Sequence, residues 1–484
     1  MNKNDIYEIQ IDDIGNDGEG IGHIADRQNG RCFAVFVKDA IVGDVAEVKI
    51  IKVKKSYAYG RLMRLIKPSS HRVEAVCKNA RACGGCSLMH MSYERQLRYK
   101  LDKVKSCMKR IGGIENADDL CEGIYGMDEP YHFRNKMQFP VGVDKDGNIK
   151  IGFYATHTHS IVDLDSCAIA HPVNDYIVKH LRSWLEKWYK QNKNLIYQEE
   201  SHTGLVRHIL TRVGFKTKEL MVCLVINGTG LDKSCREELV AAVKAATNEY
   251  GNGIKVTGIS LNFNTEKTNR ILGDTCATVY GQDYITDYIG DVSFRISPLS
   301  FYQVNPVQTE KLYSKAIEYA DLKGDETVWD LYCGIGTISL SLAGHVKQVY
   351  GVEIVPQAIE DAKINAKINN IENATFFCGK AEELVPKFYE RQAENTDTAL
   401  LHPDVIIVDP PRKGCDSVLL DTILKASPDR LVYVSCDPAT LARDIKYLGE
   451  GGYTPDKIAV YDQFGHSGHV ETVVLMSKVN TVKG

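Results

Sequence analysis

The sequence predicts an α/β protein with three parts: an N-terminal OB-like β-barrel, a central α+β domain and a C-terminal doubly wound parallel sheet. Three observations lead to this prediction. Short strand-like runs follow one another closely over residues 1–67, mixed patterns fill residues 68–294, and strand, turn and helix alternate over residues 295–484. A chain of 484 residues is also too long for one core.

The composition is that of a folded globular protein, with 44% hydrophobic and 25% charged residues. We find no apolar run near the roughly 18 residues that a membrane span requires and no basic-then-apolar leader. We therefore expect a cytoplasmic protein with no membrane partner and no obligate protein partner. The 14 cysteines are spread along the chain, which favours reduced thiols with a metal-binding or catalytic subset.

The first part of the chain reads as short strands between residues 6 and 66, which predicts a small closed barrel of about five strands. From Lys49 to Arg72 there are eight Lys or Arg residues and no Asp or Glu. Such a basic stripe is typical of an RNA-binding surface. The alternative is a solvated edge strand whose lysines prevent pairing with other chains.

The central part begins with a predicted helix over residues 93–111, in which apolar residues recur at helical spacing. Its basic residues are expected to extend the positive surface: Arg95, Arg98, Lys100, Lys103 and Lys105. Further along, strand-like runs at 137–141, 220–226 and 254–263 surround a helical stretch at 172–191. This mixture predicts an α+β domain.

Seven strands are expected in the C-terminal part, at residues 327–331, 348–352, 374–377, 404–408, 430–434, 457–461 and 470–476. The last two are close enough in sequence to form a hairpin. In a doubly wound sheet, ligands bind at the carboxyl ends of the parallel strands. Residues that follow these strands are therefore the candidates for a functional site.

Residues 330–337 (DLYCGIGT) follow the first of these strands and open a helix. Gly334 and Gly336 allow a ligand to approach the backbone closely, and Glu353 ends the next strand, where an acidic residue commonly binds ribose hydroxyls. Ser339 stands where a dinucleotide fingerprint has its third glycine, which favours S-adenosylmethionine over NAD. The alternative is an ordinary tight turn.

Residues 409–414 (DPPRKG) follow the fourth strand. They resemble a motif of amino-methylating enzymes in which an aromatic residue follows the two prolines. Arg412 takes that place here, which argues against attack by an exocyclic amine and favours chemistry on a ring carbon.

Methylation of a pyrimidine ring carbon requires a nucleophile, because carbon 5 of uracil attacks a methyl group only after a thiolate has added to carbon 6. Cys436 is the candidate: it follows the fifth strand and precedes Pro438 and a predicted helix. The N-terminus of that helix is expected to lower the thiol pKa. Cys333 is the rival thiol, although its place in the glycine turn suggests a cofactor-lining residue.

The same reaction requires a base that removes the proton from carbon 5. A strand at 457–461, parallel to its neighbours, reaches the carboxyl edge before the hairpin turns back, so Glu471 should begin the returning strand at that edge. A carboxylate followed directly by an apolar run is otherwise hard to place. His469 is the alternative base.

A compact cysteine group occupies residues 77–86, where Cys77, Cys83 and Cys86 are joined by a loop containing two glycines. A fourth thiolate would complete an iron-sulfur site, and Cys167 is the expected fourth ligand. A zinc ion is the alternative to the cluster, but structural zinc sites more often have two C-x-x-C pairs, and only one such pair is present.

Taken together, these motifs resemble the RNA uracil-5 methyltransferase family, and specifically its iron-sulfur 23S ribosomal RNA branch. The N-terminal barrel resembles a TRAM domain, residues 435–440 (SCDPAT) resemble the nucleophile motif, and residues 469–471 (HVE) resemble the base motif. The resemblance implies a [4Fe-4S] cluster on the four cysteines. It also implies contacts to S-adenosylmethionine from four residues: Gln303, Tyr332, Glu353 and Asp409.

The resemblance further implies a 23S rRNA substrate and extrusion of one uridine, with Phe301, Asn305, Arg134 and Lys136 holding the flipped base and its phosphates. Members with the same features in other lineages act on tRNA, so a tRNA uracil-5 methyltransferase is the first alternative. A noncatalytic RNA-binding assembly factor is the second. A cytosine-5 methyltransferase would generally place proline before its cysteine, whereas this chain has Ser435.

Overall fold

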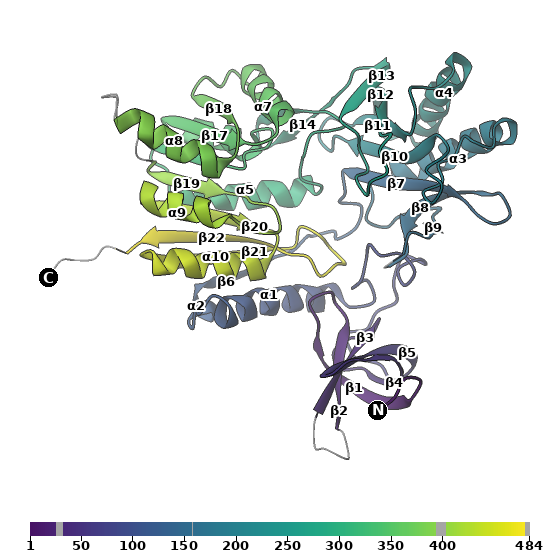
Figure 1. Cartoon of the computed structure of the whole chain (residues 1–484), viewed down its shortest axis with the longest axis horizontal. Helices are drawn as coiled ribbons and strands as arrows, with labels where there is room; N and C mark the ends of the chain where they lie inside the picture. The colour runs from purple at the N-terminus through teal and green to yellow at the C-terminus, as the bar shows by residue number, and fades with distance from the viewer. Residues whose placement is uncertain (26–31, 157, 394–402, 480–484) are drawn as a thin grey trace. The chain divides into compact units, whose positions relative to one another are not determined.

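The computed structural model describes residues 1–25, 32–156, 158–393 and 403–479. The chain divides into two compact units (Figure 1). Unit 1 comprises Met1–Lys103, Phe153–Val162 and Phe464–His469, and unit 2 comprises Val104–Gly152, Asp163–Gln463 and Val470–Gly484. The division into three domains at residues 67 and 294 stays a prediction.

The N-terminal barrel, purple in Figure 1, belongs to unit 1 and closes in the order β1-β2-β3-β5-β4. Alternate residues of its strands point inward, so that Ile9, Val35 and Val48 are almost completely buried. A side chain at position 22 would meet the backbone oxygen of Gln10 at 2.4 Å, so the close strand pairing requires glycine there. The strands are β1 (Ile6–Ile14), β2 (Gly20–Ala25), β3 (Cys32–Lys38), β4 (Val45–Val53) and β5 (Tyr57–Lys67).

The predicted five-stranded barrel is thereby confirmed. Its closure also rules out the alternative that the basic stripe belongs to an edge strand. Strand β1 pairs with both β2 and β4, so the sheet has no open edge within its described strands. The lysines of β4 therefore do not protect an edge strand.

A seven-stranded sheet in the order β13-β12-β11-β10-β7-β8-β9 forms the centre of the α+β region. Helices α3 (Val173–Gln191) and α4 (Lys233–Tyr250) pack against each other beside it (Figure 1). Strand β10 is buried along its whole length. The strands are β7 (Lys136–Val143), β8 (Ile149–Tyr154), β9 (Ile161–Asp163), β10 (Val206–Val213), β11 (Glu219–Ile226), β12 (Lys255–Phe263) and β13 (Thr275–Gly281).

The C-terminal sheet has eight strands in the order β18-β17-β16-β19-β20-β22-β21-β6. All seven predicted strands occur, and the last two form the expected antiparallel hairpin, β21 with β22. The strands are β16 (Thr327–Leu331), β17 (Gln348–Glu353), β18 (Ala374–Cys378), β19 (Val405–Val408), β20 (Arg430–Ser435), β21 (Tyr453–Tyr461) and β22 (Glu471–Lys478). The eighth strand, β6 (Cys121–Tyr125), was not predicted and pairs in parallel with β21.

Helices follow the strands of this sheet as a doubly wound fold requires. They are α5 (Pro306–Ala320), α6 (Thr337–Leu342) with the 3₁₀ turn η1 (Ala343–His345), α7 (Pro356–Ile368), α8 (Ala381–Ala393), α9 (Ser417–Ala426) and α10 (Pro438–Glu450). The remaining elements are α1 (Tyr93–Arg110), α2 (Ala117–Leu120), β14 (Ile285–Ile289) and β15 (Val292–Ile296). Among the described residues, none of the helices combines the length and apolar character that a membrane crossing requires.

Candidate active site

The turn between β16 and α6 takes an unusual backbone path. Three of its residues have positive φ: Tyr332 at 72°, Gly334 at 56° and Gly336 at 82°. The N–H groups of Tyr332 and Cys333 donate to the carbonyl of Val352, at 2.9 and 3.0 Å, which fixes the turn to β17. No atom lies within 4 Å of the position that a Cβ on Gly334 would occupy, so this stretch of backbone is open to a ligand.

Glu353 ends β17 beside that turn. Its Oε2 accepts a hydrogen bond from the Gly334 N–H at 3.2 Å, and its Oε1 accepts one from the Val355 N–H at 2.9 Å. The carboxylate therefore connects the two strand ends that the sequence assigned to the cofactor. Both loops are positioned together by one side chain.

Ser339 explains the missing third glycine of the dinucleotide pattern. Its hydroxyl donates to the buried carboxyl of Asp330 at 2.5 Å. Burial raises the pKa of Asp330 to about 6, and the nearby charge of Glu353 acts in the same direction. A glycine at position 339 would leave this buried carboxyl without that donor.

Asp409 follows β19 at the same edge of the sheet, because β19 runs parallel to both β16 and β20. Burial raises its pKa to about 7, and repulsion from Asp330 adds to the effect. Two acidic residues at neighbouring strand ends therefore titrate within or near the neutral range.

Cys436 and Glu471 lie at adjacent strand ends. Strands β20 and β22 are antiparallel, and Ser435 of β20 lies opposite Thr472 of β22. Cys436 directly follows Ser435 and Glu471 directly precedes Thr472, so the two residues lie at the same edge of the sheet. Glu471 is 3% exposed, while Cys436 is partly exposed. The position predicted for Glu471 from topology is therefore the position it has.

The thiol of Cys436 does not have the lowered pKa that we expected. Burial, together with the charges of Glu471 and Asp409, raises its pKa to about 12, although Arg412 opposes this shift. At the start of α10, the N–H groups of Ala439 and Thr440 donate to the carboxylate of Asp437, both at 3.0 Å. The helix terminus is thus occupied by a cap, and the prediction of an activated thiol in the free protein was wrong.

The pKa of Glu471 is also shifted upward. Burial raises its pKa well above the ordinary value, Asp409 adds to this, and Arg412 lowers it. Cys436, Glu471, Asp409 and Arg412 consequently act on one another as a single electrostatic group.

Gln303 lies in the loop before α5 and is 7% exposed. Its backbone carbonyl accepts from the Asn135 side chain at 2.9 Å, which fastens the loop to the start of β7. Asn305 caps α5: its Oδ1 accepts from the Gln308 N–H at 3.2 Å, and its Nδ2 donates to the carbonyl of Gln463 at 3.2 Å. Asn305 is completely buried, so the expectation that it holds a flipped base was wrong.

Two other residues predicted to hold the base or its phosphates differ in exposure. Phe301 is 69% exposed, as an aromatic ligand contact requires. Lys136 pairs with Arg212 across β7 and β10, and burial, together with the charges of Arg212 and Arg134, lowers the pKa of Lys136 to about 7. Arg212 itself is buried and donates to the carbonyl of Ser300, so it supports the loop that carries Gln303.

One residue near the site carried no recognisable sequence signal. Tyr313, on α5, is buried and its hydroxyl lies 3.0 Å from that of Thr337. Burial and the charge of Asp409 raise its pKa. In the sequence it is one of several apolar positions of an amphipathic helix.

The rival residues are placed differently. Cys333 is buried within the glycine turn, whereas Cys436 is partly exposed, and burial raises the pKa of Cys333 well above the ordinary value. His469 is exposed, and its ring lies 6.0 Å from that of Phe464 within unit 1.

The cysteine group lies in a turn-rich segment of unit 1. The backbone of Cys83 forms an isolated antiparallel β-bridge with that of Ala155, and the Gly84 N–H donates to the carbonyl of Tyr154. Burial raises the pKa of Cys83, and the charge of Cys77 adds to it. Cys167 belongs to unit 2, where its N–H donates to Asp175 at 3.2 Å. Within the described residues, no three His, Cys, Asp or Glu side chains are arranged to hold a metal ion.

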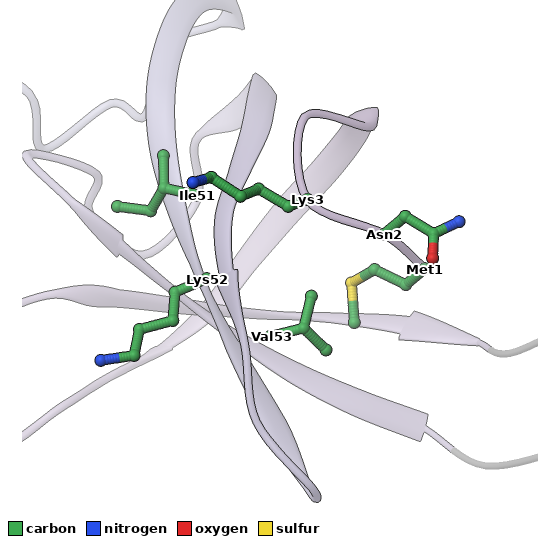
Figure 2. Close-up of a pocket in the computed structure, with 6 residues that line it drawn as sticks. All are labelled: Met1, Asn2, Lys3, Ile51, Lys52 and Val53. Atoms are coloured by element: carbon green, nitrogen blue, oxygen red, sulfur yellow. The ribbon is translucent and has the colours of Figure 1, made fainter.

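The basic stripe of the barrel is largely exposed, and two of its arginines form ion pairs. Lys52, Lys54 and Lys55 are exposed, whereas Arg72 forms a buried ion pair with Asp44 and Arg64 pairs with Glu47. Lys52 also lines an open pocket of about 640 Å³ with Ile51, Val53 and the first three residues of the chain (Figure 2).

The cations of helix α1 extend this surface less than expected, because four of the five make contacts within the protein. Lys100 is completely buried and donates to the carbonyl of Phe464, and Lys103 donates to the carbonyls of Asn16 and Gly468. Arg98 pairs with Asp102, and Lys105 pairs with Asp118. These side chains hold the fold together.

A doubly wound sheet with this glycine turn and acidic strand ends defines the class as an S-adenosylmethionine-dependent methyltransferase. Residues 257–479 match the family tRNA (Uracil-5-)-methyltransferase, and residues 2–63 match the TRAM domain. The chain belongs to this family of RNA (uracil-C5)-methyltransferases and carries an N-terminal TRAM domain.

Relatives resemble the chain over nearly its whole length. An "Uncharacterized RNA methyltransferase" of Clostridium tetani is 47% identical over 99% of this chain and 97% of its own. A protein of Clostridium acetobutylicum with the same description is 47% identical over 99% and 98%. The crystal structure of Pyrococcus abyssi tRNA (uracil-54, C5)-methyltransferase with S-adenosyl-L-homocysteine covers 97% of this chain and 99% of that one, at 27% identity and a TM-score of 0.73.

Proposed function

We propose that this enzyme methylates carbon 5 of a uridine in 23S rRNA through a covalent bond between Cys436 and carbon 6. The observation that supports the proposal best is the electrostatic group formed by Cys436, Glu471, Asp409 and Arg412 at the carboxyl edge of the sheet. It combines a thiol, a buried carboxyl and a cation beside the glycine turn, which is the set that the reaction requires.

The proposed reaction has three steps: addition of the thiolate, methyl transfer and elimination. The Cys436 sulfur bonds to carbon 6, and the electron pair of the 5,6 double bond moves toward the carbonyl at carbon 4. Carbon 5 then takes the methyl group, and the donor leaves as its neutral thioether. Glu471 removes the proton from carbon 5, the double bond forms again, and the carbon–sulfur bond breaks to release the thiolate.

The proton of the thiol has to leave before the sulfur attacks. Asp409, whose charge acts on the Cys436 thiol and whose pKa is raised to about 7, accepts this proton. Arg412 lowers the pKa values of both Cys436 and Glu471, and the positive sulfonium of the methyl donor would act in the same direction. Activation of the thiol is thus tied to binding of the substrates.

The methyl donor would be held by Gln303, Tyr332, Glu353 and Asp409. Tyr332 and Glu353 belong to the open turn, and Asp409 ends a strand parallel to β16. These residues come from separate segments of unit 2.

Transfer RNA is the second candidate substrate, and one comparison favours it. The Pyrococcus abyssi enzyme acts on tRNA by its description, and its chain aligns over 99% of its length. The presence of the barrel therefore does not favour 23S rRNA over tRNA as the substrate.

The test is methyl transfer from labelled S-adenosylmethionine to transcripts of 23S rRNA and of tRNA, followed by identification of the nucleoside. We expect 5-methyluridine in 23S rRNA. Label only in tRNA would reassign the substrate, and 5-methylcytidine, or no transfer at all, would refute the proposed reaction. A noncatalytic assembly factor would retain its function in a Cys436→Ala variant.

We also propose that Cys77, Cys83, Cys86 and Cys167 bind a [4Fe-4S] cluster. The supporting observation is that Gly84 and Gly85 add no side chain next to the thiols of the loop. Within the part of the chain that the structure describes, these thiols are not arranged as a metal site. Anaerobic preparations should contain about four iron and four sulfide ions per chain, and Cys86→Ser should remove them. Folded, anaerobically prepared protein that contains no iron, or iron retained in full by the Cys86→Ser variant, would refute the proposal.

A further inference from the structure

We propose that a second pocket of unit 2, formed around His171, binds an unpaired nucleobase of the RNA. The inference rests on the proposed function, because RNA is the ligand. The pocket has a volume of about 450 Å³ and lies between the β10–β11 hairpin, the turn after α4 and His171, which stands two residues before α3. None of the eight residues that line it is acidic.

Three aromatic rings provide a surface for a flat ligand. The His171 ring lies 5.5 Å from that of Phe215 and 5.9 Å from that of Tyr250, with both interplanar angles at 71°. In such edge-to-face pairs the two faces do not cover each other, so aromatic surface is left for stacking. Stacking of unpaired bases on aromatic side chains is the usual way in which proteins hold single-stranded RNA.

The polar groups suit a base with an attached phosphate. The Nδ1 of His171 accepts a hydrogen bond from the Val173 N–H at 3.3 Å, so the ring carries its proton on Nε2 and can donate there. Burial lowers the pKa of His171 to about 4, which keeps the ring neutral at pH 7. Lys218 adds one positive charge, and its ammonium donates to the carbonyl of Asn252 at 3.2 Å.

The pocket is built on a fixed backbone. Asp287 accepts hydrogen bonds from the N–H groups of Phe215 and Lys216, at 2.9 and 3.0 Å, and thereby holds the hairpin turn. Lys218 and Asn252 both have positive φ, at 61° and 53°. Strained residues of this kind persist where the surrounding structure holds them, and they are common at binding sites.

The test uses a short oligoadenylate, which contains no uracil and so cannot react at Cys436. With an 8-azidoadenosine in the strand, irradiation of the full-length protein should attach the probe to peptides containing His171, Phe215 or Tyr250. Attachment only to peptides outside these segments would overturn the proposal. This measurement requires no variant, so it does not depend on how a substitution affects folding.

Variants provide the second measurement. Phe215→Leu keeps an apolar side chain but removes the ring, and we expect affinity for the oligoadenylate to fall at least about fivefold. Lys218→Gln should reduce the salt dependence of binding by about 0.7 in the logarithmic slope. The matched control is Lys216→Gln, an exposed lysine of the same hairpin that does not line the pocket, which should change neither value.

Binding of both variants with the wild-type affinity and salt dependence would overturn the proposal. Its failure is distinguishable from failure of the proposed function, since uridine methylation by the wild-type enzyme does not depend on the outcome with oligoadenylate.

Discussion

Glu471 lies close enough to Cys436 for its charge to raise the pKa of that thiol. The two residues come from strands that run in opposite directions, and the register that places Ser435 opposite Thr472 brings them together. A negative charge on this carboxyl therefore disfavours the thiolate form of Cys436.

Replacing Arg412 with Gln should make the Cys436 thiol less reactive. Arg412 lowers the pKa of this thiol, so its loss decreases the thiolate fraction at a given pH. Because the arginine is exposed and partly screened, we expect alkylation of Cys436 by iodoacetamide at pH 9 to slow about two- to tenfold. The control is Lys413→Gln, an exposed neighbour, and equal rates in both variants would contradict the assigned role.

Replacing Gly336 with Ala should damage the cofactor turn. A Cβ at this position would lie 3.1 Å from the Phe376 ring, and the φ of 82° is unfavourable for alanine. We expect a loss of about 1 to 3 kcal/mol in stability and weaker binding of S-adenosylhomocysteine, measured by calorimetry. Gly344→Ala is the control, since no atom lies within 4 Å of its Cβ position. Unchanged affinity in the Gly336 variant would show that the turn does not contact the cofactor.

Replacing Asp44 with Asn should destabilise the barrel at neutral pH. Burial alone would raise the pKa of Asp44, but hydrogen bonds from Arg72, and from the N–H groups of Ile41 and Ser69, lower it below 3.8. The folded pKa is thus below the unfolded value, so this stabilisation is present above pH 3.8 and is lost as the pH falls through the folded pKa.

We expect a loss of about 2 to 3 kcal/mol at pH 7, measured by hydrogen exchange of the barrel amides in the full chain. The difference from wild type should narrow below pH 4. Asp13→Asn, on the exposed side of β1, serves as the control. A difference that stays constant down to pH 2 would contradict the ionic role of Asp44.

Removing the exposed lysines of the barrel should weaken RNA binding through its electrostatic part. The slope of log affinity against log salt should decrease by about 0.7 to 0.9 for each lost phosphate contact. The variant carries Gln at three positions: Lys52, Lys54 and Lys55. The control carries Gln at three exposed lysines that pair with glutamates, Lys187, Lys233 and Lys363. Equal slopes in the two variants would place the RNA elsewhere.

The sequence predicted the fold well where hydrophobic periodicity and turn residues agree. All seven C-terminal strands and the closed barrel have this property. Strand β6 was missed because it is only five residues long and completes a sheet whose other strands begin about two hundred residues later. Long-range pairing of this kind leaves no local pattern.

The positions of the site residues could be predicted from the sequence, but the pKa of the thiol could not. Strand topology correctly placed Glu471 at the same edge as Cys436. The thiol pKa could not be predicted, because it depends on burial and on the charges of Asp409 and Glu471, which come from other strands. The side chain of Asp437 also caps the helix that follows the thiol.

The role of Cys436 is tested most directly in the Glu471→Gln variant. Addition to carbon 6 and methyl transfer can proceed there, but removal of the carbon 5 proton cannot. Incubation with S-adenosylmethionine and 23S rRNA should therefore accumulate a protein–RNA complex that survives denaturing electrophoresis. Mass spectrometry should find a methylated uridine linked to the peptide containing Cys436, and Cys436→Ser should abolish the complex. Normal turnover without a complex, or linkage to another residue, would contradict the covalent mechanism.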